Sequence, residues 1–108
     1  MASNRRQHPR YLKELPVMAE LPDGRQLNGT TYDLSCNGAC IRVDYDLPSG
    51  ARLMVELNPP SASKGELYTL WASVLHSRPH RLSTCNLGIC YAHPPTHYLQ
   101  LIERLAAE

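Results

Sequence analysis

The stretch Asp33-Leu34-Ser35-Cys36-Asn37-Gly38 decides how this chain is organised. Apolar alternation runs into the stretch and resumes directly after it, which predicts a strand, a tight turn and a second strand. Its asparagine and glycine are the residue types that most readily adopt positive φ, so the chain is expected to reverse there. Its aspartate and serine are two residues apart and would face the same side of an extended segment. We call residues 33–38 the corner.

Period-two alternation extends outward from the corner in both directions. Turn-forming residues separate the alternating segments, as in the run Pro22-Asp23-Gly24. Within the segment 70–76, the residues Leu70, Ala72, Val74 and His76 are expected to share one face. The predicted strands are 16–21, 26–32, 39–45, 52–57, 70–76 and 88–91. Six short strands with no intervening helical segment predict an all-β fold, an antiparallel sandwich or barrel.

The end of the chain has a different period. Pro94 and Pro95 stop the last strand, and Tyr98, Leu101, Ile102 and Leu105 then recur at helical spacing. A helix at about 96–107 is therefore predicted, and a helix this short must dock its apolar face on the barrel. With 108 residues, the chain is expected to form one domain over 16–108, preceded by a flexible basic N-terminal arm over 1–15.

Charge is concentrated in the arm. Arg5, Arg6, Arg10 and Lys13 all precede the first acidic residue, whereas the whole chain has a net charge of only +1. The near-neutral body argues against bulk attraction to nucleic acid or anionic lipid. No signal peptide and no apolar run of the roughly 20 residues that a membrane span needs are recognisable. We therefore expect a cytoplasmic protein without a membrane span.

Metal and catalytic sites are not expected. The cysteines are spaced C-x3-C (Cys36, Cys40) and C-x4-C (Cys85, Cys90), which is not the knuckle spacing of structural zinc. A reducing compartment also disfavours disulfides, so the cysteines are interpreted as ordinary thiols. The five histidines form no metal-binding pattern, and no nucleophile–base arrangement is recognisable from spacing. The sequence thus predicts a protein that is not an enzyme.

Two short motifs occur together in this all-β context. Arg6 and Arg10 form R-x-x-x-R in the arm, and Asp33, Ser35 and Gly38 form D-x-S-x-x-G at the corner. In this combination and order the chain resembles the PilZ domain family over essentially residues 5–108. The resemblance implies a six-stranded antiparallel β-barrel with a C-terminal helix. It also implies binding of the bacterial second messenger cyclic di-GMP.

The resemblance also implies roles for particular residues. Arg6 and Arg10 would wrap the ligand, while Asp33, Ser35 and Gly38 would receive a guanine. Arg5, just before R-x-x-x-R, would influence whether one or two ligand molecules are held. His76 stands where many family members have tryptophan and is either a further contact or a strand-end residue. Trp71 has the opposite parity to His76 and is expected to pack against a partner or a loop.

The residue chemistry agrees with such a ligand. A guanidinium group matches phosphate and guanine acceptors, and a carboxylate accepts from the N–H groups of a guanine edge. We therefore expect a ligand-switched receptor or adaptor, acting on an unidentified effector protein in motility or biofilm regulation. A nucleotide-independent interaction module on the same fold is the alternative. Single-stranded nucleic-acid binding is disfavoured, because the body is neutral and the chain has one Trp and no Phe.

Overall fold

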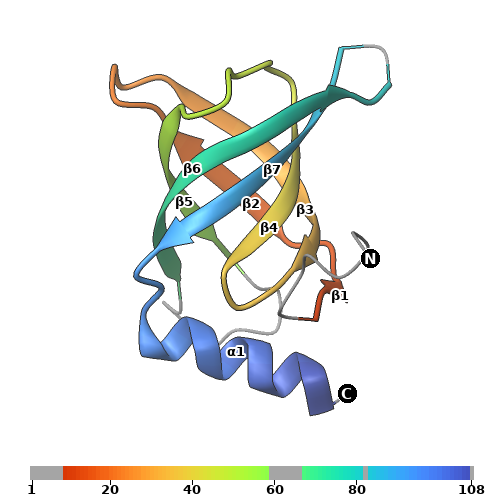
Figure 1. The fold of residues 1–108 in the computed structure, drawn as a ribbon, viewed down its shortest axis with the longest axis vertical. Coiled ribbons are helices and arrows are strands. Elements are labelled where there is room, and N and C mark those ends of the chain that lie inside the picture. The colour runs from red at the N-terminus through yellow and green to blue at the C-terminus, as the bar shows by residue number, and fades with distance from the viewer. Residues whose placement is uncertain (1–8, 59–66, 82, 108) are drawn as a thin grey trace, which may run out of the picture.

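Seven strands and one helix make up the described part of the chain in a computed structural model, which covers residues 9–58, 67–81 and 83–107 (Figure 1). The elements follow one another as β1 (Tyr11–Leu12), β2 (Pro16–Glu20), β3 (Gln26–Leu34), β4 (Gly38–Val43), β5 (Arg52–Leu57), β6 (Tyr68–Pro79), β7 (Cys85–Ala92) and α1 (Thr96–Ala107). The predicted C-terminal helix is thus present. The strand β1 is an addition that the sequence pattern did not indicate.

All neighbouring strands pair antiparallel and close into a barrel. The order around it is β2, β3, β4, β7, β6 and β5, and the pairing of β2 with β5 completes the ring. The predicted six-stranded antiparallel barrel is therefore confirmed. The short strand β1 pairs with the end of β3 beside the ring.

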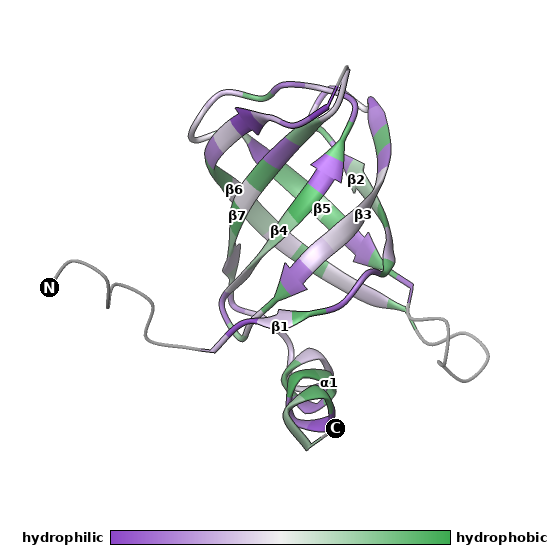
Figure 2. Cartoon of the chain, turned by 90° about the vertical axis from the view of Figure 1, so that its right-hand side faces the viewer, coloured by the Kyte–Doolittle hydropathy of each residue, from purple (hydrophilic) through white to green (hydrophobic). Residues whose placement is uncertain are grey.

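The core lies inside the barrel and follows the alternation of the sequence (Figure 2). On β5, for example, Leu53, Val55 and Leu57 are buried, whereas Arg52 is exposed. At one end of the barrel, α1 lies across the opening (Figures 1 and 2). Its buried side chains are those at helical spacing, Tyr98, Leu101, Ile102 and Leu105. No helix among the described residues is long and apolar enough to span a membrane.

A β-bulge in β6 changes the expected orientation of His76. Leu70, Ala72 and Val74 are buried, but the pairing of β6 with β7 shifts between Val74 and His76, and His76 is exposed. The expectation that all four share one face is therefore wrong, because the extra residue reverses the alternation. The same bulge places His76 on the outer face, where Trp71 also lies.

The chain reverses at the corner without the positive φ angles that the sequence predicted there. Among the described residues, positive φ occurs at Gly24, Gly50 and His93, and not at the asparagine and glycine of the corner. Gly38 is required for another reason, since a Cβ atom there would lie 2.3 Å from the backbone oxygen of Ile89. The glycine thus lets β4 and β7 approach closely.

Some strand boundaries also differ from the sequence pattern. The strand predicted for 39–45 ends at Val43, so Tyr45 lies outside β4 and is 40% exposed. Strand β6 extends to Pro79, beyond the predicted end at 76, and β7 begins at Cys85 and not at 88.

Candidate functional site

The chain before β2 places Arg10 beside the corner. Tyr11 and Leu12 pair with Leu34 and Asp33 at the end of β3. Between β1 and β2 the regular register is interrupted, although the N–H of Lys13 donates to the carbonyl of Tyr32 at 3.2 Å and the N–H of Thr31 to the carbonyl of Leu15 at 2.9 Å. The buried hydroxyl of Thr31 adds two further bonds. This hydroxyl accepts from the backbone N–H of Leu15 at 2.8 Å and donates to the carbonyl of Lys13. The described part of the predicted arm is thereby held along β3, with Arg10 at its start.

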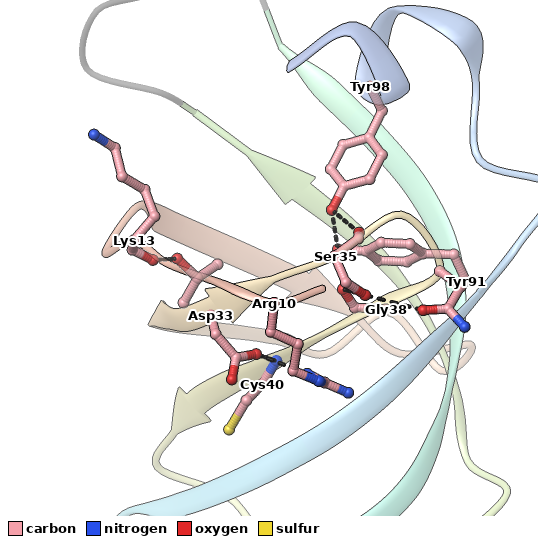
Figure 3. Close-up of polar contacts among 10 residues, drawn as sticks. Arg10, Lys13, Asp33, Ser35, Gly38, Cys40, Tyr91 and Tyr98 are labelled. Carbon is pink, nitrogen blue, oxygen red and sulfur yellow. Dashed lines mark hydrogen bonds and ion pairs between the residues drawn. The ribbon is translucent and has the colours of Figure 1, made fainter. Parts of the chain in front are cut away.

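Arg10 and Asp33 form an ion pair on the outer surface of the barrel (Figure 3). The guanidinium Nη1 donates to Asp33 Oδ1 at 2.7 Å, and the same oxygen accepts from the backbone N–H of Cys40 at 3.1 Å. The two side chains are 22% and 10% exposed. Because both bonds use Oδ1, the other carboxylate oxygen is engaged by neither of them.

Ser35 holds the turn of the corner from inside. Its backbone N–H donates to the carbonyl of Gly38 at 2.9 Å. Its hydroxyl oxygen lies 2.9 Å from Asn37 Oδ1 and 3.2 Å from the Gly38 carbonyl oxygen. Ser35 is buried, and its hydroxyl lies within the turn.

Two buried tyrosines tie the corner to α1 and β7 (Figure 3). The Tyr98 hydroxyl donates to the carbonyl of Ser35 at 2.8 Å and lies 3.1 Å from the Tyr91 hydroxyl. The backbone N–H of Tyr91 donates to the carbonyl of Asn37 at 2.9 Å. Burial raises the pKa of both tyrosine hydroxyls above the usual value, so both keep their protons at neutral pH. The helix is thus anchored on the corner by a hydrogen bond between residues 63 positions apart.

Asp33 and His76 lie in one row across four strands. The register pairs Asp33 with Cys40, Cys40 with Gly88, and Gly88 with His76. At a strand spacing of about 4.8 Å, this row, which we call the Asp33–His76 row, is roughly 14 Å long. The imidazole of His76 lies over Gly88, where an added Cβ would be 2.4 Å from Nε2. Sequence reasoning missed Gly88, although a glycine inside a strand often marks such a close approach.

Cationic and aromatic groups flank this row. Arg42 and Asn86 pair across β4 and β7 in the next outer row, and Arg42 Nε donates to Asn86 Oδ1 at 3.0 Å. The Arg42 guanidinium also lies 4.9 Å above the ring of Tyr32. Partial desolvation and the positive charges of Arg42 and Arg81 lower the pKa of His80. This side of the barrel therefore suits an anionic ligand with planar groups.

The predicted site residues fall into two groups. Arg10, Asp33 and His76 lie on one outer surface, while Ser35 and Gly38 form the turn at its edge. Arg5 and Arg6 lie outside the described residues. Cys36, Cys85 and Cys90 are half-buried free thiols, and no group of three metal-ligating side chains occurs among the residues described.

Comparison with known protein families identifies this chain. The model of the PilZ domain matches residues 4–108, so the chain belongs to the PilZ domain family. The PilZ domain is a non-catalytic receptor domain, and the family binds cyclic di-GMP. The search of curated proteins found no match.

Solved structures share the fold at low sequence identity. The PilZ domain of YcgR from Escherichia coli, solved with cyclic di-GMP, has a TM-score of 0.73 and 17% identity, and the match covers 94% of this chain and 88% of that one. The Bacillus subtilis inhibitor of motility MotI/DgrA has a TM-score of 0.79 and 17% identity, over 96% of this chain and 51% of that chain. This chain therefore spans about half the length of MotI. The PilZ domain of CeSA from a cellulose-synthesising bacterium has a TM-score of 0.60 and 20% identity, covering 90% of this chain and 93% of that one.

Proposed function

We propose that this chain binds cyclic di-GMP on the outer surface that carries the Asp33–His76 row. The observation that carries the proposal is the contact between Arg10 and Asp33, one residue from each motif, 23 positions apart and 2.7 Å from each other. Arg5, Arg6 and Arg10 would supply the cationic groups, and Asp33, Ser35 and Gly38 the edge that receives a guanine. His76 is the contact proposed for the far end of the row.

The contacts of Asp33 support its role as the base reader. The N–H of Cys40 fixes Oδ1, so the carboxylate keeps its orientation if Arg10 moves. A guanine presents its N1–H and N2–H₂ donors side by side, and a carboxylate with a second oxygen can accept both. Arg10 would then turn toward a phosphate, which a guanidinium binds bidentately. Ligand binding thus exchanges one charge-assisted contact for several.

We propose that the bound state is read by an effector protein in the bacterial cytosol, in motility or biofilm regulation. Two features support a ligand-dependent change in the surface that the protein presents to an effector. Arg10 already connects the arm to the corner, and the Tyr98 hydroxyl connects the corner to α1. Contact of the arm with the ligand would cover the corner and alter the surface beside the helix.

Isothermal titration calorimetry tests the proposal, with GTP and cyclic GMP titrated separately as control nucleotides. We expect cyclic di-GMP to bind at low micromolar concentration or tighter, and neither control to bind at about 100 µM. The variant Arg25→Ala is a matched control, because Arg25 also forms a surface ion pair, 2.8 Å from Asp23, away from the Asp33–His76 row. Arg10→Ala should lose binding and Arg25→Ala should keep it. Absence of binding by the unmodified protein would leave the nucleotide-independent interaction module as the function.

A further inference from the structure

An apolar face lies on β2, β5 and β6. Its side chains point outward and are in register, Met18 opposite Glu56, Glu20 opposite Met54, and Met54 opposite Trp71. Trp71, the largest aromatic side chain of the protein, is 62% exposed. We call these five residues the Met–Trp face. Of the strands that carry the Asp33–His76 row, it shares only β6, so the two surfaces can be occupied independently.

A groove begins at the Met–Trp face. A cavity of about 320 Å³ is lined by Glu20, Leu21, Pro22, Arg52, Leu53, Met54 and Trp71. A second cavity of about 330 Å³ shares Leu21, Pro22 and Arg52 with it and continues to Leu47 and Pro48. Each volume is at the lower end of those that hold a small ligand, and together they offer space for successive side chains of a peptide.

The charges at this face indicate the chemistry of the partner: the face carries Glu20 and Glu56, and the cavity beside it also holds Arg52. Glu20 and Glu56 are half-buried between methionines, and neither forms a salt bridge within the described residues. Trp71 is exposed and the two methionines of the face are half-buried, and tryptophan and methionine are residue types enriched in the cores of protein interfaces. We propose that the Met–Trp face docks a segment of another protein that presents a large apolar side chain flanked by lysine or arginine. The apolar side chain would fill the cavity beside Trp71, and the cation would lie against Glu20 or Glu56.

A second copy of this chain fits the face less well. A two-fold dimer places the same surface patch on both subunits opposite itself. The carboxylates of Glu20 and Glu56 would then lie near the same two carboxylates of the other subunit, and like charges brought together are unfavourable. A partner with basic residues is favoured instead, because its positive charges would attract both carboxylates.

Trp71 is the only tryptophan of the chain, so its fluorescence reports directly on this face. The probes are a synthetic amphipathic peptide of leucine and lysine and its counterpart with glutamate in place of lysine, each titrated without nucleotide. We expect the basic peptide to produce a saturable blue shift of the emission and the acidic peptide to produce none. The affinity for the basic peptide should fall at least fivefold in the double variant Glu20→Lys/Glu56→Lys.

A charge-matched variant separates the face from the overall charge. Asp44→Lys/Glu103→Lys changes the net charge by the same amount at two exposed positions outside the face and should bind the basic peptide with no more than a small loss. Equal losses in both double variants, equal shifts with both peptides, or no shift at all would overturn the proposal. A dimer in light scattering that Trp71→Ser converts to a monomer would overturn it in favour of self-association. If the lysine variant of the face does not fold, Glu20→Gln and Glu56→Gln replace it, with the same expected direction.

Discussion

The imidazole of His76 lies across Gly88 so closely that a methyl group on Gly88 would be 2.4 Å from Nε2. The atoms in the way belong to a side chain at the surface, and such a side chain can rotate. Gly88→Ala should therefore lower the free energy of unfolding by less than about 1 kcal/mol. It should displace His76 from the Asp33–His76 row and weaken cyclic di-GMP binding by roughly tenfold, or about 1.4 kcal/mol. Calorimetry and thermal unfolding of the same sample check both parts; unchanged affinity would remove His76 from the site.

Gly38→Ala is expected to lower the stability of the fold more than Gly88→Ala does. Here the added Cβ would be 2.3 Å from the backbone oxygen of Ile89, which is held in the pairing of β4 with β7. Backbone cannot rotate away, so the strands must separate at a cost of about 1–3 kcal/mol. A thermal midpoint lower by at least about 5 °C is expected. A midpoint within 1 or 2 °C of the original protein would show that the two strands are not so tightly constrained.

Arg10→Ala should separate binding from folding. The Arg10 and Asp33 side chains are only 22% and 10% exposed, so their ion pair should contribute somewhat more to stability than an exposed pair, which contributes about 0–1 kcal/mol. Asp33 keeps its bond from the N–H of Cys40 in the variant, so the thermal midpoint should fall modestly while the protein stays folded. A charge-assisted hydrogen bond to a ligand contributes about 1.5–3 kcal/mol, and binding of cyclic di-GMP should weaken by more than tenfold. Arg6→Ala should weaken binding in the same way. Unfolding of Arg10→Ala at room temperature would instead assign the arginine to the structure of the corner.

Tyr98→Phe tests the connection between α1 and the corner. The substitution keeps the ring and leaves the Ser35 carbonyl without its donor at 2.8 Å, which costs about 1–3 kcal/mol for a buried polar group. Tyr91→Phe is the matched control, because it leaves that bond in place. Chemical unfolding should show the larger loss for Tyr98→Phe, together with weaker nucleotide binding. Equal losses of unfolding free energy in the two variants would mean that the bond to Ser35 adds no measurable stability.

The sequence predicts the barrel well because the barrel depends on local patterns. Alternation is a property of neighbouring residues, and it places residues such as Leu53 and Val55 in the core correctly. The orientation of His76 depends on a bulge, which has no reliable local signal, so parity alone predicted the wrong face. The role of Gly38 depends on β7, which is about 50 residues away in the chain. Contacts of this kind, like the one between Tyr98 and Ser35, are set by the closure of the barrel.

The buried tyrosine pair should make the protein sensitive to alkaline pH. Burial raises the pKa of Tyr91 and of Tyr98 in the folded protein, whereas both have a pKa of about 10 in the unfolded chain. Below about pH 10 both states are protonated, and the contribution of the pair to stability is complete. Above it the unfolded chain loses protons that the folded chain keeps, so stability falls by up to about 1.4 kcal/mol per pH unit for each tyrosine. Urea midpoints at pH 8 and at about pH 11 measure this fall, and the double variant Tyr91→Phe/Tyr98→Phe should show a smaller one. Since both proteins share every other titrating group, an equal fall in the two would show that the pair does not cause the alkaline loss.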